Sequence, residues 1–124
     1  MASGMTQERR QAPRVSEPID LAVTSDAAAF RAEAVNLSIS GAYCTTDRFI
    51  PTMTKLQLQF ELPHNPRRVP VRCEGVVVRV EPVVENAEQG RYHVAIFFSD
   101  IADRDRAAIA TFVRERLSQG PSTR

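Results

Sequence analysis

The stretch Lys55-Leu56-Gln57-Leu58-Gln59-Phe60-Glu61-Leu62 alternates polar and apolar side chains without a break. Strict alternation of this kind is typical of a β-strand with one dry face and one wet face. Pro63-His64-Asn65-Pro66 follows directly and predicts a turn, because two prolines flank a residue that favours turns. The chain around this strand is therefore expected to form a sheet that buries one face.

Segments on both sides of this strand also alternate and predict five further strands. They are residues 19–23, 30–35, 42–45, 69–80 and 92–98. In the long segment the apolar phase changes at Gly75, from Val71 and Cys73 to Val76 and Val78. Such a change predicts a β-bulge, which bends a strand and allows a sheet to close on itself.

After the last predicted strand, the apolar spacing becomes that of a helix. The apolar residues of one helical face are Ala108, Ile109, Phe112, Val113 and Leu117. Asp100 or Asp103 is expected to cap the start, and Gly120-Pro121 to end the helix. Six bent strands followed by one helix predict a mainly β fold: a six-stranded antiparallel β-barrel with a C-terminal α-helix.

Length and composition narrow the function further. A chain of 124 residues with a net charge of +1 is expected to form one domain, residues 9–117, with a flexible segment before it (1–8) and a tail after it (118–124). The near-neutral charge argues against a nucleic-acid polymer as partner. No apolar run is long enough to enter a bilayer, and no signal region is present, so the cytoplasm is the expected compartment.

Catalytic and metal-binding patterns are weak in this sequence. Cys44 and Cys73 alternate with apolar residues and are expected to be buried free thiols. With His64 and His93 they form no metal-ligand spacing. His93 has no nucleophile partner that spacing suggests, so an enzyme is not expected, and neither is a metal or a cofactor.

The segment Arg9-Arg10-Gln11-Ala12-Pro13-Arg14 gathers arginines in a chain with fifteen arginines and one lysine. Pro13 disfavours helical backbone at Ala12, so the segment is expected to be an extended arm. A guanidinium can bond phosphate oxygens in a fork, read the edge of guanine and stack on a base. The alternative is a solvated basic tail.

The segment Asn36-Leu37-Ser38-Ile39-Ser40-Gly41 follows the second predicted strand. Asn36 and Ser38 lie two residues apart, so on a strand they would share one face and could hydrogen-bond a base or a phosphate. Gly41 would permit a left-handed turn or a close approach of a ligand to the backbone. The alternative is an ordinary polar β-turn.

Together the segments read R-R-x-x-x-R followed by N-x-S-x-x-G, and from about Glu8 to Leu117 the chain resembles the PilZ domain family. Members of this family are bacterial receptors for cyclic di-GMP, a ring of two guanosines and two phosphates, and fold as a six-stranded β-barrel with a C-terminal helix. The resemblance implies that Arg10 and Arg14 clamp phosphate and guanine. Many members carry Asp where this chain has Asn36.

The resemblance also implies roles for the remaining motif residues. Asn36 and Ser38 would hydrogen-bond the ligand from the barrel surface, and Gly41 would keep the turn close to it. The position of Arg9 influences how many ligand molecules family members hold, and a stacking arginine there predicts two molecules of cyclic di-GMP for this chain.

The sequence therefore predicts a receptor for cyclic di-GMP that acts on a downstream protein partner of unknown identity. The arm, residues 1–15, has few apolar side chains, so it is expected to be mobile and to become ordered when ligand binds. Two alternatives stay open: a PilZ-like interaction module that binds no nucleotide, and a small barrel for single-stranded nucleic acid. The second is disfavoured because aromatic residues are few and fall on expected core positions.

Overall fold

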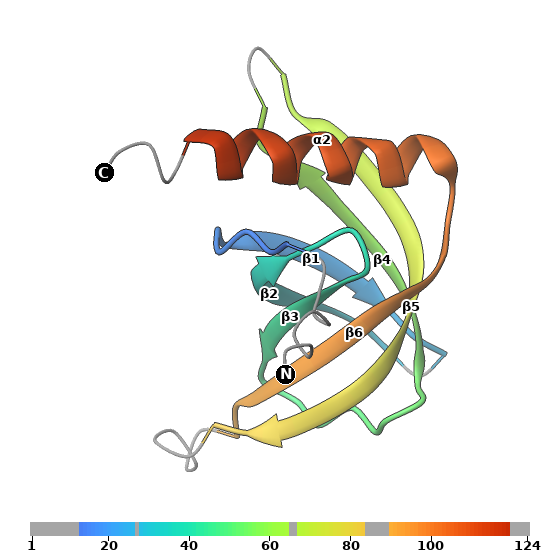
Figure 1. The fold of residues 1–124 in the computed structure, drawn as a ribbon. Helices are drawn as coiled ribbons and strands as arrows, with labels where there is room; N and C mark the ends of the chain where they lie inside the picture. Colours follow the sequence, from blue (N-terminus) through green and yellow to red (C-terminus); the bar gives the residue numbers. More distant parts are fainter. Residues whose placement is uncertain (1–12, 27, 65–66, 84–89, 120–124) are drawn as a thin grey trace, which may run out of the picture.

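Antiparallel strands close into a barrel in the part of the chain that the computed structural model describes, residues 13–26, 28–64, 67–83 and 90–119 (Figure 1). The strands are β1 (Ile19–Thr24), β2 (Ala29–Leu37), β3 (Gly41–Thr46), β4 (Lys55–Leu62), β5 (Val69–Pro82) and β6 (Tyr92–Ile101). Their order around the barrel is β1-β2-β3-β6-β5-β4, and the helix α2 (Asp103–Gln119) follows β6. The predicted six-stranded barrel with a C-terminal helix is confirmed.

Strand β4 supplies one side of the core in the way its alternation predicts. Its four apolar side chains point inward and are almost fully buried, while the residues between them are exposed. The strand pairs with β1 on one side and with β5 on the other. This burial of one face by every strand fills the barrel with Leu, Val and Ile side chains, which is the main stabilising contribution of the fold.

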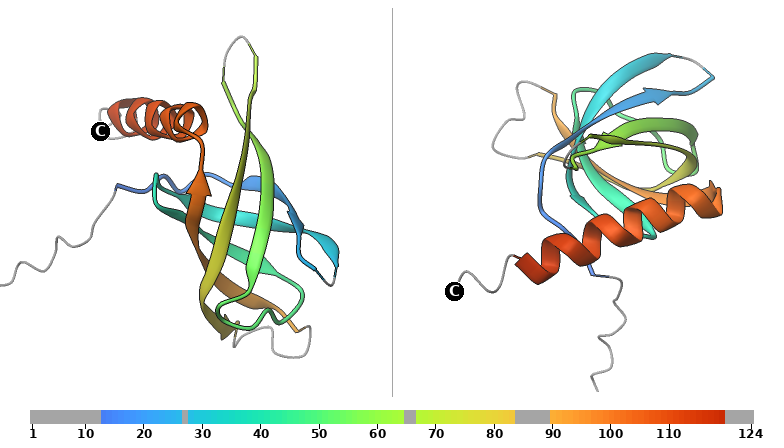
Figure 2. Two further views of the ribbon diagram at one scale, coloured as in Figure 1. Left: turned by 90° about the vertical axis from the view of Figure 1, so that its right-hand side faces the viewer. Right: turned by 90° about the horizontal axis from the view of Figure 1, so that it is seen from above.

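Helix α2 packs against one end of the barrel (Figures 1 and 2). Ile109, Phe112 and Val113 join the core, as predicted, whereas Leu117 keeps 38% of its surface exposed. Strand β6 extends to Ile101, so Asp100 belongs to the strand and the prediction that it caps the helix is wrong. Asp103 begins α2, where a carboxylate interacts favourably with the helix dipole. Within the described residues, no helix is long and apolar enough to cross a membrane.

The irregularities of β5 differ from the prediction. Gly75 continues the inward phase between Cys73 and Val77, and its missing side chain leaves room for Ile96, which would lie 2.5 Å from an added Cβ. The register with β6 shifts first because β6 has an extra residue, Ser99, and again because β5 has one, Val78. The phase therefore changes after Val77, and Val78 is 52% exposed where the sequence suggested a core residue.

Candidate binding site

The last described residues of the arm lie against the end of β2. Val15 is buried, its N–H donates to the carbonyl of Leu37, and the N–H of Leu37 donates to the carbonyl of Val15, each at 2.9 Å. Val15 therefore belongs to the core and not to the arm, and the mobility expected of the residues before it stays a prediction. This pair of hydrogen bonds holds Arg14 beside the second sequence motif. Arg9 and Arg10 lie outside the described residues.

Arg14 and Asn36 meet although 22 residues separate them in sequence. The Nη1 of Arg14 donates to the Oδ1 of Asn36 at 2.7 Å. An Asp at this position would add a negative charge and make the contact an ion pair, whereas the neutral amide accepts a bond from the charged guanidinium. The side chain of Arg14 is exposed, so its other N–H groups can face a ligand.

A bulge in β2 decides where Asn36 points. Ala32 and Ala34 are buried, and continued alternation would turn Asn36 inward as well. The register with β3 instead skips Val35, because Ala34 pairs with Cys44 and Asn36 with Tyr43. The extra residue reverses the phase, so that Leu37 enters the core and Asn36 reaches the surface.

Ser38 lies beyond the end of β2 and does not share a face with Asn36. It is fully buried, and its hydroxyl contacts the Oγ of Ser40 at 3.1 Å and accepts from the N–H of Ser40 at 3.2 Å. Its N–H donates to the carbonyl of Gly41 at 2.9 Å. These bonds fix the β2–β3 turn, residues 38–40, so Ser38 has a structural role, whereas Ser40 lines the surface groove described below.

The close approach of β6 explains Gly41. A Cβ at this position would lie 2.2 Å from the carbonyl oxygen of Ile96 and 3.3 Å from the Cα of Phe97. Any side chain would therefore push β3 away from β6, with which it pairs along its whole length. The glycine is required by strand packing next to the groove, and not by a left-handed turn.

Arg14 and Asn36 lie at the edge of a groove of about 380 Å³ on the barrel wall. We call it the arm groove. It is lined by Arg14, Asn36, Ser40, Gly41, Ala42, Tyr43, Val78, Arg79, Ala95, Ile96 and Phe97. Two arginines face it, and no carboxylate is among these described lining residues. The Nε of Arg79 also lies 3.6 Å from the Oε2 of Glu81, in an exposed ion pair that salt and solvent weaken.

The arm groove combines groups that suit a nucleotide. Arg14 and Arg79 can bind phosphate, Asn36 and Ser40 can hydrogen-bond a base edge, and the exposed ring of Phe97 offers a flat apolar face. Sequence analysis missed Ser40, Arg79 and Phe97. Arg79 and Phe97 enter the site only because β5 and β6 pair beside β3, which local patterns do not reveal.

The cysteines and His93 carry no sign of catalysis. Burial raises the pKa of Cys44 and of Cys73 from 9.0 to about 12, and the nearby carboxylate of Asp105 adds to the effect at Cys73. Both thiols therefore stay protonated and unreactive at neutral pH. The ring of His93 packs beside that of Tyr43, with centroids 5.2 Å apart. Among the described residues, no cluster of His, Cys, Asp and Glu could hold a metal ion.

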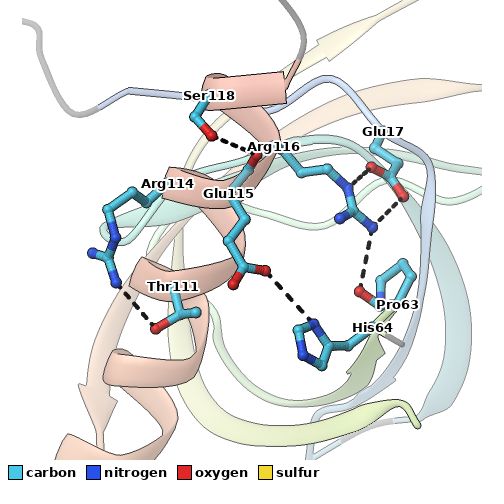
Figure 3. A network of polar contacts seen from close by, with 8 residues as sticks. All are labelled: Glu17, Pro63, His64, Thr111, Arg114, Glu115, Arg116 and Ser118. Atoms are coloured by element: carbon cyan, nitrogen blue, oxygen red, sulfur yellow. Dashed lines mark hydrogen bonds and ion pairs between the residues drawn. The ribbon is translucent and has the colours of Figure 1, made fainter. Parts of the chain in front are cut away.

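A second contact of the N-terminal segment, made by Glu17, joins it to α2 (Figure 3). The Nε of Arg116 donates to Glu17 Oε1 at 2.7 Å, and its Nη2 donates to the carbonyl of Pro63 at 3.3 Å. The hydrogen bond to Glu17 raises the pKa of Arg116 above its ordinary value. The guanidinium also stacks on Phe112, 4.6 Å from the ring centroid. The helix and the segment that leads into β1 are thereby joined.

Comparison with known proteins agrees with this architecture. The family model described as PilZ domain matches residues 8–115. No curated protein matches the sequence significantly. Among solved structures, the chain is similar to the Bacillus subtilis protein titled inhibitor of motility (MotI/DgrA), with a TM-score of 0.77 and 21% identity over 90% of this chain and 53% of that one. The chain thus spans about half the length of this neighbour, and at this identity the likeness concerns the fold.

Proposed function

The chain belongs to the PilZ domain family, and we propose that it is a cytoplasmic receptor module that binds cyclic di-GMP in the arm groove. The observation that supports this proposal most is the hydrogen bond of 2.7 Å between Arg14 and Asn36. It joins the two motif segments at the surface and presents a guanidinium to a groove that no carboxylate lines among the described residues.

The proposed roles follow from the chemistry of each group. Arg14 binds phosphate or the guanine edge, with Asn36 and Ser40 as hydrogen-bonding partners and Arg79 as a second cation. Arg10 and Arg9 would add further guanidinium groups from the preceding segment. Ser38 and Gly41 shape the turn, and a direct contact between Ser38 and the ligand requires the turn to open, because this hydroxyl is buried.

The proposed signal is a rearrangement of the arm before Arg14. Val15 is already bonded to Leu37, so the part that can change lies N-terminal to it. Ligand phosphates would neutralise the arginines and draw this segment over the groove, which changes the surface that a partner contacts. Order parameters of the backbone amides of residues 6–12 and 14 should rise on addition of cyclic di-GMP, and values that do not change would exclude this route.

Isothermal titration calorimetry tests the binding proposal directly. We expect cyclic di-GMP to bind with a dissociation constant in the micromolar range or below, on the order of −8 kcal/mol or better. Cyclic GMP and GTP serve as controls and should bind much more weakly, since each offers a single guanine. We expect two ligand molecules per chain, and Arg9→Leu should shift this number towards one. A stoichiometry of one in both proteins would contradict the role of Arg9.

A second candidate function is an interaction module that binds a protein partner without nucleotide. Absence of any heat or amide shift with cyclic di-GMP at high micromolar concentration would favour it. The observation behind this alternative is an apolar groove along α2, which lies outside the arm groove.

A further inference from the structure

An apolar groove of about 480 Å³ lies between α2, the described end of the arm and the β2–β3 turn. We call it the helix groove. The arm contributes Pro13 and the β2–β3 turn contributes Ile39, while α2 contributes Ala110, Val113 and Leu117. Leu117 keeps 38% of its surface exposed although it is the last apolar residue of the helical stripe. Pro13 is exposed too, Ile39 is half-buried and Val113 is buried. Apolar surface that stays accessible in a concave site marks a surface for another molecule.

The charge at the helix groove has a definite sign. Arg114 lines it, and no carboxylate is among the described lining residues. The guanidinium of Arg114 has a single weak hydrogen bond, to the hydroxyl of Thr111 at 3.4 Å, and no ion pair with the described part of the chain. Figure 3 shows Arg114 on the opposite side of α2 from the Arg116–Glu17 pair. A partner that places a carboxylate here would satisfy this cation.

The shape of the helix groove suits an α-helix. The α2 residues that line it recur every three or four positions, from Ala110 through Val113 and Arg114 to Leu117 and Ser118. They therefore follow one side of α2 for about 12 Å, with the buried Val113 facing the barrel. The small side chains of Ala110 and Ser118 at the two ends allow another helix to approach closely, at the 8–10 Å typical of helix pairs. A partner helix would place apolar residues at i, i+3 or i+4, and i+7 in the groove.

From these observations we infer that the helix groove binds an amphipathic helix of a partner protein, with an apolar stripe flanked by acidic residues. Binding of such a helix requires no nucleotide, so the experiments below are done without cyclic di-GMP. If they fail, the receptor proposal is not affected. If cyclic di-GMP does not bind, the helix-groove proposal is likewise not affected.

Selection from a phage-displayed library of helix-biased peptides tests the inference, with an excess of the soluble Leu117→Ser variant as competitor. We expect enriched peptides to carry the apolar spacing above and Asp or Glu beside it. No enrichment against the competitor, or enrichment of basic or uncharged peptides, would overturn the inference. So would a parent protein that forms dimers in sedimentation analysis which Leu117→Ser abolishes, since the groove would then bind a second copy.

Matched charge reversals on one helix make the test specific. With the best enriched peptide, Arg114→Glu should weaken binding about tenfold or more, because it turns the attraction at the groove into repulsion. Arg104→Glu changes the net charge equally at an exposed position near the other end of α2, outside the helix groove, and should leave the affinity within about twofold. Equal losses in both variants would indicate non-specific electrostatics and overturn the inference. Melting curves of each variant verify that it is folded.

Discussion

At the scale of single residues, the groove motif divides into two groups. Arg14 and Asn36 are at the surface and bonded to each other, whereas Ser38 is buried in the turn and Gly41 lies against β6. The first group is free to contact a ligand, and the second maintains the backbone on which the first depends. The thiols of Cys44 and Cys73 belong to neither group and only fill the core.

We predict that Arg14→Ala weakens cyclic di-GMP binding by roughly tenfold to a hundredfold, since a hydrogen bond to a charged group contributes about 1.5–3 kcal/mol. The melting temperature should barely change, because the side chain is exposed. Calorimetry measures the affinity of the parent, of Arg14→Ala and of a control variant, Arg31→Ala. Arg31 is an exposed arginine of β2 that lies outside the arm groove. Unchanged affinity with a lower melting temperature would instead make Arg14 structural.

The thiols predict a loss of stability at alkaline pH. Their pKa values are about 12 in the folded chain and 9.0 without burial, so above pH 9 the unfolded chain releases protons that the folded chain retains. The free energy of unfolding then falls as pH rises, by up to about 1.4 kcal/mol per pH unit and thiol. Urea titrations between about pH 8 and pH 11 should show this slope in the parent and a smaller one in a Cys44→Ala/Cys73→Ala variant. Equal slopes would contradict it.

At the scale of elements, contacts of the N-terminal segment join the arm to two parts of the fold. Val15 bonds β2 through its backbone, and Glu17 bonds α2 through Arg116. The chain from Val15 to Glu17 is therefore bonded to β2 at its first residue and to α2 at its last. This arrangement places the end of the arm between the strand that carries Asn36 and the helix that carries the helix groove.

The Arg116 contact gives a prediction at this scale. Arg116→Met removes the pair with Glu17 and the bond to the Pro63 carbonyl but keeps an apolar chain over Phe112. We expect the free energy of unfolding to fall by about 1–2 kcal/mol. Arg114→Met, which loses only the weak contact with Thr111, should change it by less than about 0.5 kcal/mol. Urea unfolding of both variants measures these changes. Equal losses of unfolding free energy would show that the pair with Glu17 contributes nothing specific.

At the scale of the whole molecule, the arm groove and the helix groove share two short segments. Arg14 lines the first and its neighbour Pro13 lines the second; likewise Ser40 lines the first and Ile39 the second. A ligand that contacts Arg14 and Ser40 therefore acts on the residues next to those that line the other groove. Such shared segments allow two sites to influence each other without any large movement of the barrel.

This arrangement predicts coupling between nucleotide and partner, and it rests on the proposed function. Saturating cyclic di-GMP should strengthen binding of the selected acidic peptide by about threefold to tenfold, because a ligand on Arg14 would restrict the neighbouring Pro13 before the peptide arrives. The peptide should strengthen nucleotide binding by the same factor. Calorimetry in both orders measures this. Tight nucleotide binding with no change in peptide affinity would show that the two grooves act independently.

The elements could be predicted from sequence because each depends on local periodicity. The alternation of Lys55–Leu62 indicates a half-buried strand wherever it lies, and the spacing of Ile109, Phe112 and Val113 indicates a helix with one apolar face. The two motif segments likewise predicted that the arm and the end of β2 meet, and Arg14 bonds Asn36 in the structure. Side-chain chemistry and spacing along the chain contain this information.

Tertiary structure decided which motif side chains reach the surface. The extra residues Val35 and Val78 reverse the phase of β2 and β5, and each is defined only by the register with a neighbouring strand. Closing the barrel brings β6 against Gly41 and places Phe97 in the groove that Arg14 lines. Spacing along the sequence does not predict these outcomes. A shift of one residue between paired strands exchanges the inner and outer faces of a strand, and that shift depends on how the whole barrel closes.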